Sequence, residues 1–397
     1  MIKVEIETGL RIIEEELKGT KSTETIDIMD SLHRVLATDV FSPINIPLYD
    51  RSPLDGYAVK ADNLSNDSIK RFKVLETVYA GGVPTKAINE GEATRIMTGG
   101  MYPKGANTVI RQEDVIVDGD YIETTTCLKP FTNYIHAGED IRKGEKIANL
   151  GQKLNSIHIG VIAGTGIDSV QVYKELSIGI LSTGDEIVNY NQTAAPGQIY
   201  DSNHVTLVQR LKELGFNNVK HVRSGDDKEN IKNEFKRLIA ETDFVISTGG
   251  VSVGAKDYIP TALEEIGGKL LFDTVRMKPG SHMVLYAFDD TPVLGLSGNP
   301  FAAYATFEIF GRKILSILSN DSTLELKRIS GLSKNSFEKH SKVRRIIRAT
   351  YDSGYVTFPS KHDSGVMSSM IGSNCFVDIP AGSNPISPGE TVEVVLL

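Results

Sequence analysis

The chain has 397 residues, a length that corresponds to two to four domains of ordinary size. Hydrophobic residues make up 40% of it and charged residues 24%, a balance that excludes a disordered chain and is typical of globular proteins. The formal net charge of −8 argues against a protein that binds nucleic acid or acidic membranes, since either would need a basic face.

Cysteine use and hydropathy narrow the class further. Cys127 and Cys375 are the only cysteines and stand far apart, which excludes metal sites built from thiolates and argues against a disulfide framework. No apolar run approaches the ~18–20 residues of a membrane span, and the N-terminal residues lack the basic-then-apolar plan of a signal peptide. We therefore expect a cytoplasmic protein without a membrane segment.

The N-terminal part is predicted to begin with helices and to continue as a β-rich region. Apolar residues recur at helical spacing up to a stop at Gly19, and a second helix is expected near 27–37. Prolines then exclude a long helix over 43–53. From about 59 to 172, short β-prone runs alternate with Gly and Pro turns, which predicts one or two β domains.

From about residue 175 to 320, strand and helix patterns alternate. The apolar runs 176–184 and 242–250 are typical of strands buried on both faces, and a helix with Ser202 or Asn203 as its cap follows the first of them. This alternation predicts an α/β domain with a doubly wound, mostly parallel sheet. The other expected elements are a strand at 217–225, helices at 227–241 and 258–266, a strand at 291–299 and a long helix at 300–318.

The last residues alternate apolar and polar with a period of two, which predicts a small C-terminal β-barrel-like domain. The expected division is an N-terminal helical segment (1–45), a β-rich lobe (46–145), a return segment of the N-terminal β domain (146–174), the α/β domain (175–322) and the C-terminal β domain (323–397).

Three apolar strands of the α/β region each end in a small, Gly-rich polar turn, at 180–188, 245–258 and 294–300. Ligands of an open parallel sheet bind outside the carboxyl ends of its strands, and glycine lets backbone N–H groups approach an anion. Asn299 as a helix cap, with Pro300 at the first helical position, would leave N–H groups free for a phosphate. A tight strand–helix connection explains any one of these turns, but three on one sheet favour a phosphate-bearing ligand.

The same loops carry the acids Asp185, Glu186 and Asp257. Carboxylates beside a phosphate site favour a hard cation, Mg²⁺ first. The alternative is that they cap helices or are solvated on loops.

Common nucleotide-binding and hydrolase motifs are absent from the sequence. It contains no P-loop, no complete dinucleotide fingerprint, no GxSxG elbow and no HExxH. The eight histidines show no metal-ligand spacing, so we expect His136, His282 and His362 to be surface residues rather than ligands.

Two further clusters have competing interpretations. Asp50, Ser52 and Asp55 share a proline-restricted loop, which is either a site or a turn whose Asp side chains bond their own backbone. In the tail, Arg344 and Arg348 would share one strand face, and we expect a solvated edge strand protected by charge.

Eight motifs stand in order along essentially the whole chain: DRSPLDGYAV, IMTGG, AGEDIRKGE, STGDE, ISTGGVSVGAKDY, MKPG, SGNP and DSGVMSSM. The combination of DGYA with STGGVSVG is specific. Taken together, these motifs resemble the molybdopterin molybdenumtransferase family, which includes MoeA and the E domain of gephyrin.

The resemblance implies that the protein inserts molybdate into adenylylated molybdopterin and releases AMP, with Mg²⁺, as the last step of molybdenum cofactor synthesis. It implies an elongated homodimer whose active site lies between the α/β domain of one subunit and the β lobe of the other. An adenylyltransferase and apo-molybdoenzymes are the implied protein partners, and no nucleic acid or membrane is expected. Since the pterin's dithiolene sulfurs hold the molybdenum, a chain almost free of cysteine fits this function.

Carried over residue by residue, the resemblance implies catalytic roles for Asp55, Thr98, Asp140, Glu186, Asp257 and Lys278. Glu186 and Asp257 are the expected Mg²⁺ ligands, and Lys278 would pair with a phosphate or molybdate. Substrate binding is expected from Asp226, Gly249, Gly250, Ser252, Ser297, Asn299, Pro300 and Ser364. Polarisation of the phosphoanhydride by Mg²⁺ would make AMP a better leaving group, so no protein nucleophile is required.

The chain departs from the family pattern at several positions. Ser281-His282 replaces the Lys-Pro that often ends KPGKP, and Ser297 replaces the first proline of PGNP. Thr274 stands where a lysine is common, with Arg276 nearby as a substitute, and Asn107 replaces the Asp of GAD. With fewer positively charged side chains, the protein would bind oxyanions less tightly or would prefer another oxyanion, tungstate for example.

Two other functions stay open. Adenylylation of molybdopterin uses the same α/β domain type, but the GGTG loop of that family is replaced here by GGVSVGAKD. A catalytically weak paralogue, acting as a scaffold or molybdopterin-binding module, is favoured by the missing lysine.

Overall fold

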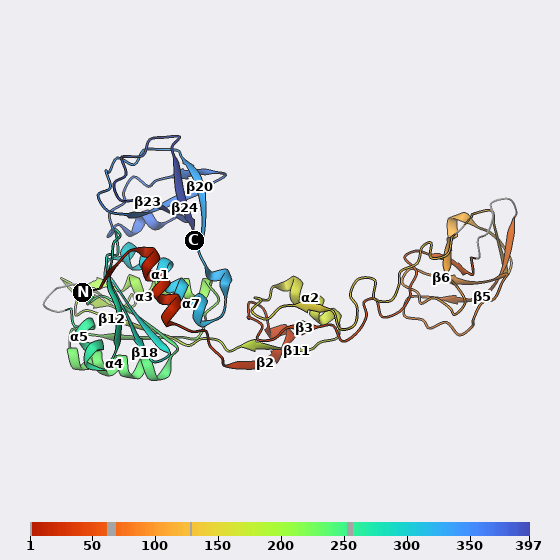
Figure 1. Cartoon of the computed structure of the whole chain (residues 1–397), viewed down its shortest axis with the longest axis horizontal. Helices are drawn as coiled ribbons and strands as arrows, with labels where there is room; N and C mark the ends of the chain where they lie inside the picture. Colours follow the sequence, from red (N-terminus) through yellow and green to blue (C-terminus); the bar gives the residue numbers. More distant parts are fainter. Residues whose placement is uncertain (1, 62–68, 128, 252–256) are drawn as a thin grey trace. The chain divides into compact units, whose positions relative to one another are not determined.

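The computed structural model describes residues 2–61, 69–127, 129–251 and 257–397, and the chain forms two compact units (Figure 1). Unit 1 contains Met1–Glu24, His33–Ala37 and Val172–Leu397, and unit 2 contains Thr25–Leu32 and Thr38–Gln171. The finer division into five segments stays a prediction.

Unit 1 is built on a seven-stranded sheet with the order β1-β17-β18-β19-β16-β12-β15. β19, β16, β12 and β15 are parallel neighbours, whereas β18 pairs antiparallel with both β17 and β19. The predicted parallel arrangement is confirmed for β19, β16, β12 and β15, and the sequence analysis does not identify β17 and β18. The strands are β1 (Lys3–Val4), β12 (Ile178–Thr183), β15 (Val219–Ser224), β16 (Phe244–Thr248), β17 (Lys269–Val275), β18 (His282–Phe288) and β19 (Thr291–Leu296).

Apolar side chains on both faces of the sheet are buried, as a doubly wound fold requires. In β16, Phe244 and Ile246 belong to one hydrophobic core and Val245 to the other. The first core is covered by α1, α3, α6 and α7, and the second by α4 and α5 (Figure 1). The helices are α1 (Ile6–Glu16), α3 (Ser202–Glu213), α4 (Lys228–Glu241), α5 (Ile259–Glu265), α6 (Pro300–Thr306) and α7 (Arg312–Leu318).

The predicted long helix at 300–318 forms as three consecutive pieces, with a π-helical segment (Phe307–Gly311) between α6 and α7. The N-cap of α3 is Asp201, not Ser202 or Asn203 as expected, because its carboxylate accepts the His204 N–H at 3.0 Å. This cap leaves the Asn203 side chain available for another contact.

The helix expected at 27–37 is wrong. β2 (Thr23–Asp27) and a single 3₁₀ turn (Ile28–Asp30) occupy its first part. The Asp27 carboxylate accepts the Met29 N–H at 2.8 Å and closes that one turn, while His33 has a φ of +66°, a left-handed conformation that interrupts a helix.

The C-terminal residues form a closed five-stranded barrel within unit 1, which confirms the predicted barrel-like domain. The expected solvated edge strand is wrong, because β21 pairs with β22 on one side and β23 on the other, and Arg348 is only 1% exposed. A period-two pattern does not distinguish a strand in a closed barrel from one at a sheet edge. The strands are β20 (Lys327–Ser333), β21 (Arg345–Asp352), β22 (Tyr355–Thr357), β23 (Cys375–Ile379) and β24 (Thr391–Leu396).

Unit 2 holds the predicted β-rich region, as a six-stranded sheet with the order β7-β4-β6-β5-β9-β8. A smaller sheet pairs β3 (Val40–Phe41) with β10 (Lys146–Ala148), and the helix α2 (Ser156–Gly164), which the sequence analysis does not identify, follows it. The six strands are β4 (Gly56–Val59), β5 (Lys70–Val78), β6 (Glu92–Ile96), β7 (Thr108–Arg111), β8 (Ile116–Asp118) and β9 (Tyr121–Thr124).

Two short strand pairs complete the description. β2 pairs with β11 (Ser169–Tyr173), and the boundary between the units falls within both strands. β13 (Ile187–Val188) pairs in parallel with β14 (Ile199–Tyr200) after the end of β12. Among the described helices, none has the length and apolar character needed to cross a membrane.

A buried ion cluster joins α3 to the π-helical segment. The Glu308 carboxylate is fully buried and accepts hydrogen bonds from Arg210 Nε at 2.6 Å and Arg312 Nη1 at 3.1 Å. We expect Glu308→Ala to lower the free energy of unfolding by about 3 kcal/mol, because it leaves two guanidinium groups without their buried partner. Urea denaturation of the full chain measures this value.

The matched control is Glu229→Ala, which removes an acid that is 71% exposed and paired with Lys232 on one helix. Its effect should stay within about 0.5 kcal/mol. Equal losses in the two variants would contradict a structural role for the buried cluster.

Candidate active site

The carboxyl ends of three parallel strands are aligned at one edge of the unit 1 sheet. Ser182 of β12 is paired in register with Thr248 of β16, which is paired with Leu296 of β19. The three Gly-rich turns predicted to bind an anion therefore begin at the same level of the sheet, as ligand sites of open α/β sheets require.

Glycine is required where these turns meet. Gly249 has a φ of +87°, and a Cβ at this position would lie 2.7 Å from the Thr183 carbonyl oxygen. A Cβ at Gly298 would lie 3.8 Å from the Gly249 Cα. The turns after β12, β16 and β19 thus pack backbone against backbone, which brings together three of the predicted glycine loops. Gly250 follows with a φ of +60°, and Ser252 lies outside the described residues.

The acids of the first turn have different environments. The Asp185 carboxylate accepts the Asp226 N–H at 3.0 Å, so it supports the turn after β15 and orders the predicted residue Asp226. The exposed Glu186 carboxylate folds over Gly184, where a Cβ would lie 2.6 Å from its Oε2. Half-buried Asp257 stands just before Tyr258, the N-cap of α5. No helix begins at 185–186, since β13 follows.

The start of α6 holds the predicted Ser297, Asn299 and Pro300. Asn299 is the N-cap and Pro300 the first helical residue, as expected, but the Asn299 side chain makes no capping hydrogen bond. Instead, the Ser297 hydroxyl accepts the Asn299 N–H at 3.3 Å, and the Phe301 N–H donates to the Ser364 carbonyl at 3.2 Å. The structure therefore brings Ser364 of the C-terminal region against this turn.

Lys278 lies where the sheet meets the barrel. Its backbone N–H donates to the Arg344 carbonyl at 2.9 Å and its carbonyl accepts the Ile346 N–H at 2.9 Å, while its side chain is exposed. The backbone is fixed, and within the described residues the ammonium group has no ion-pair partner, so an anion from solvent can reach it.

Two residues that the sequence analysis does not assign to the site position its loops. Asn203 Nδ2 donates to the Gly298 carbonyl at 2.8 Å. Arg348 stacks on the Phe301 ring at 4.3 Å, and its Nη2 donates to the carbonyl of Asp363, next to Ser364, at 2.9 Å. These two hydrogen bonds join residues that are 95 and 15 positions apart in the sequence, so no local pattern predicts them.

In unit 2 the structure joins Asp55 to Thr98. The Asp55 Oδ1 accepts the Thr98 N–H at 2.7 Å and the Thr98 hydroxyl at 2.8 Å. These bonds, the backbone one first, lower the pKa of Asp55. The carboxylate is therefore ionised and oriented at neutral pH.

The loop that carries Asp140 belongs to the same cluster of loops. Arg51, on the Asp55 loop, forms isolated bridges with Met101 on one side and Ile135 on the other. The Asp50 carboxylate accepts the Ala137 N–H at 2.8 Å and also bonds the Tyr134 hydroxyl. Asp50 is thus a structural residue of this cluster, and Asp140 follows on its exposed turn.

Two departures from the family pattern have a structural explanation. The Asn107 side chain accepts the Ala61 N–H at 2.7 Å and donates to the Ala61 carbonyl at 3.1 Å, a pair of bonds that an ionised Asp could not make. Arg276 lies 3.4 Å from the Glu5 carboxylate, so it is already in an ion pair, and Thr274 is only 9% exposed. Nothing in the structure explains Ser281 or His282.

The fold is that of a multi-domain α/β protein, and its strand-end loops are the candidate site. Three family models match it in order: MoeA N-terminal region (domain I and II) over 4–166, Probable molybdopterin binding domain over 179–316, and MoeA C-terminal region (domain IV) over 331–397.

Relatives and solved structures agree over nearly the whole chain. A molybdopterin molybdenumtransferase of Staphylococcus aureus (strain COL) is 32% identical over 382 residues, 94% of this chain and 90% of the relative. A molybdopterin molybdenumtransferase of Staphylococcus epidermidis (strain ATCC 12228) is 30% identical over 378 residues, with 94% and 90% covered. A crystal structure of a molybdopterin biosynthesis MoeA protein from Pyrococcus horikosii has a TM-score of 0.88 at 29% identity and covers 99% of this chain and 98% of that chain. The chain belongs to the molybdopterin molybdenumtransferase family, which confirms the expected resemblance.

The close approach at Gly249 predicts a stability effect. We expect Gly249→Ala to lower the free energy of unfolding by about 1–3 kcal/mol more than Gly267→Ala, measured by urea denaturation. Gly267 also has a positive φ, +94°, but a Cβ there meets nothing within 4 Å, so it reports the backbone strain alone. Equal losses would show that the packing of the two turns does not require glycine.

The contacts of Asp55 predict a pKa change. Thr98→Val removes the hydroxyl donor and keeps the backbone donor, so the pKa of Asp55 should rise part of the way to its ordinary value of 3.8. Carboxyl ¹³C shifts followed against pH measure it. Thr85→Val is the control, because the Thr85 hydroxyl donates to the Glu76 carboxylate and should leave Asp55 unchanged. An unchanged Asp55 pKa in Thr98→Val would contradict the assignment.

Proposed function

We propose that this protein transfers molybdenum from molybdate to adenylylated molybdopterin, with release of AMP, in molybdenum cofactor biosynthesis. Family membership over nearly the whole chain supports the reaction class. The observation that carries the proposal is the alignment of the strand ends from which the turns at Gly184, Gly249 and Gly298 begin, together with the close backbone approach of these turns. Such a backbone surface suits the phosphate groups of an adenylate.

Some residues around this edge bind the substrate, and others orient the loops that bind it. The Lys278 ammonium meets a phosphate or molybdate oxygen, and the Ser364 and Ser297 turns shape the approach to α6. Arg348 and Asn203 hold these turns without touching the reacting groups.

We propose that Glu186 and Asp257 bind Mg²⁺. The donor set fits this ion, because both side chains offer carboxylate oxygens, Glu186 exposed and Asp257 half-buried, on turns at the strand ends. When bound, the cation neutralises phosphate charge and polarises the phosphoanhydride. Asp226, held by Asp185, is the neighbouring acid of the same edge.

We propose that Asp55, Thr98 and Asp140 also act in the reaction. The lowered pKa of Asp55 keeps its carboxylate ionised, and two bonds to one oxygen orient the other towards a donor group of the substrate. The family relationship is the support for assigning Asp140 to the same role.

The proposal extends to assembly and location. We propose a homodimer that works in the cytoplasm, receives its substrate from an adenylyltransferase and delivers the cofactor to apo-molybdoenzymes. Sedimentation equilibrium of the full chain tests the dimer, and a monomer at micromolar concentration would contradict it.

The first functional test is AMP release from adenylylated molybdopterin with Mg²⁺ and either molybdate or tungstate. We expect oxyanion-dependent release, and Asp257→Asn should slow it at least about a hundredfold, because the lost carboxylate supports several kcal/mol of charge stabilisation. Asp290→Asn, an exposed acid in the turn between β18 and β19, should keep full activity.

The oxyanion comparison separates the alternatives. Faster release with tungstate would establish a tungstate-preferring enzyme, in accord with the missing lysine at Ser281. Tight substrate binding without release under either oxyanion would overturn the transferase and favour a molybdopterin-binding module.

A further inference from the structure

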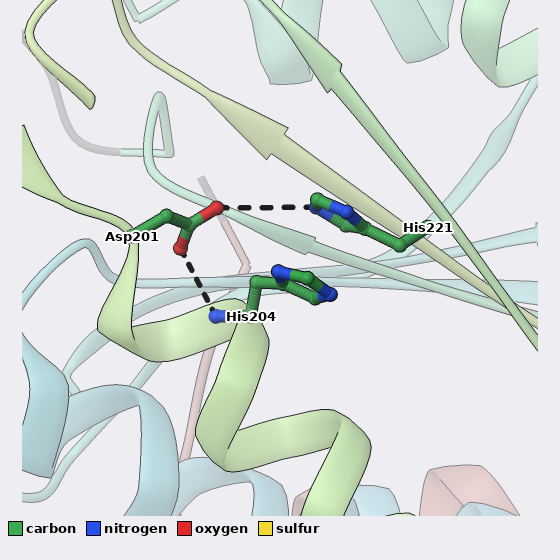
Figure 2. Close-up of side chains that lie close together, drawn as sticks. All are labelled: Asp201, His204 and His221. Carbon is green, nitrogen blue, oxygen red and sulfur yellow. Dashed lines mark hydrogen bonds and ion pairs between the residues drawn. The ribbon is translucent and has the colours of Figure 1, made fainter. Parts of the chain in front are cut away.

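A second polar cluster lies away from the glycine turns, on the edge strand of the sheet. Asp201 caps α3, His204 is in the first turn of α3, and His221 is in β15. Their ligand atoms lie within 4.8 Å of one another, and Figure 2 shows the three side chains converging. The histidines show no metal-ligand spacing in the sequence, and the structure brings His204 and His221, 17 positions apart, together through α3 and β15. A cavity of about 320 Å³ adjoins them, lined by Asn189, Gln192, Asp201, His204, His221 and Arg223.

The Asp201 carboxylate is more than nine-tenths buried and only half satisfied. Its Oδ1 accepts the His204 N–H, but within the described part of the chain its buried Oδ2 has no hydrogen-bond partner. The nearest basic atom to this oxygen is His221 Nε2 at 3.9 Å, too far for a hydrogen bond. A buried carboxylate oxygen without a donor is costly, so its position facing the two rings suits a bound cation.

The two histidine rings do not satisfy this oxygen, because no ring nitrogen of the described residues lies within hydrogen-bond distance of it. The rings are stacked, with centroids 3.3 Å apart and planes at 6° (Figure 2). Arg223 also lines the cavity, but its Nη1 donates to the Ile187 carbonyl at 3.1 Å.

We propose that Asp201, His204 and His221 bind a divalent transition metal of the zinc class. Two imidazole nitrogens and one carboxylate oxygen are a donor set that zinc prefers and Mg²⁺ does not, and the adjoining cavity leaves a fourth position for water. This site differs in chemistry from the carboxylates proposed for Mg²⁺, and it does not depend on the proposed transferase activity.

Metal binding requires a defined local rearrangement. Ligand atoms of a tetrahedral zinc ion lie roughly 3.3 Å apart, so the present separations must contract. Nitrogen lone pairs lie in the ring planes, and two parallel rings direct them side by side, so one ring must tilt and end the stack. The contact between Ser182 Oγ and His221 Nε2, now 3.2 Å, is replaced by the metal if this nitrogen is the ligand. The Asp201 cap on α3 can stay in place, because it uses the other oxygen.

The test is direct metal binding by the full chain, without an affinity tag and freed of metal. Calorimetric titration with Zn²⁺ measures affinity, and Co²⁺ in its place reports tetrahedral nitrogen and oxygen ligands by its visible absorption. We expect one site per chain, with a dissociation constant at least about tenfold higher in Asp201→Asn and in His221→Ala. Asp201→Asn retains an oxygen that caps α3, so it separates metal binding from folding. His340→Ala, at an exposed position, should bind like the unmodified protein.

Two results would overturn the proposal. One is Zn²⁺ binding that is unchanged in both Asp201→Asn and His221→Ala, which would place the ion elsewhere. The other is no saturable binding by the unmodified chain. His221→Gln serves as a further variant if His221→Ala does not fold, and it carries the same expectation. AMP release is not part of this test, so failure of the proposed function and failure of the metal site are distinguishable.

Discussion

The site in unit 1 depends on the parallel register of β12, β16 and β19. These strands are buried on both faces, so a slip of one residue would exchange Val245 with Phe244 or Ile246 between two differently shaped cores. The packing of the cores fixes this register. The turns that follow the strands therefore start at one level, and contacts between the turns are not needed to align them. Glycine then lets their backbones approach, as the 2.7 Å spacing at Gly249 shows.

The C-terminal barrel is the second constraint on the same edge. The backbone of Lys278 is hydrogen bonded to Arg344 and Ile346, at the start of β21 in the barrel. The Ser364 carbonyl accepts the N–H of Phe301 in α6. Arg348 supports the contact between Ser364 and Phe301, because its guanidinium lies on the Phe301 ring and donates to the carbonyl of Asp363, next to Ser364. A buried cation that satisfies backbone carbonyls stabilises a loop that has no regular structure of its own.

Local patterns predicted much of the fold, and long-range pairing explains most of what they could not predict. Period and turn residues identify β12, β15, β16 and β19, the helices of the α/β domain and the barrel-like character of the C-terminal domain. They miss β17 and β18, because an antiparallel pair inside an α/β sheet lacks the strand–helix alternation used to find the others. The false helix at 27–37 has apolar residues at acceptable spacing, but the Asp27 cap closes a single turn. His204 and His221 lie on different elements, so no spacing rule for one helix could have found them.

Local sequence patterns likewise predict only part of the candidate site. Asp55 and Thr98 stand 43 positions apart, and only the family pattern connected them before the structure showed their hydrogen bonds. The sequence pattern presents Asn203 only as a candidate cap, because its contact with the Gly298 carbonyl depends on the position of a turn 95 residues away.

The first turn of α3 links the glycine turns to the histidine cluster. Asn203 bonds the Gly298 carbonyl, while Asp201 and His204 on either side of it belong to the cluster. One short stretch of helix therefore supports both, and its position is set jointly by the turn after β19 and by β15. A metal ion that fixes Asp201 and His204 against β15 would restrict the same turn of helix from which Asn203 holds Gly298. The two proposed metal sites can coexist because their donors differ: carboxylates suit Mg²⁺, whereas imidazoles select a softer ion.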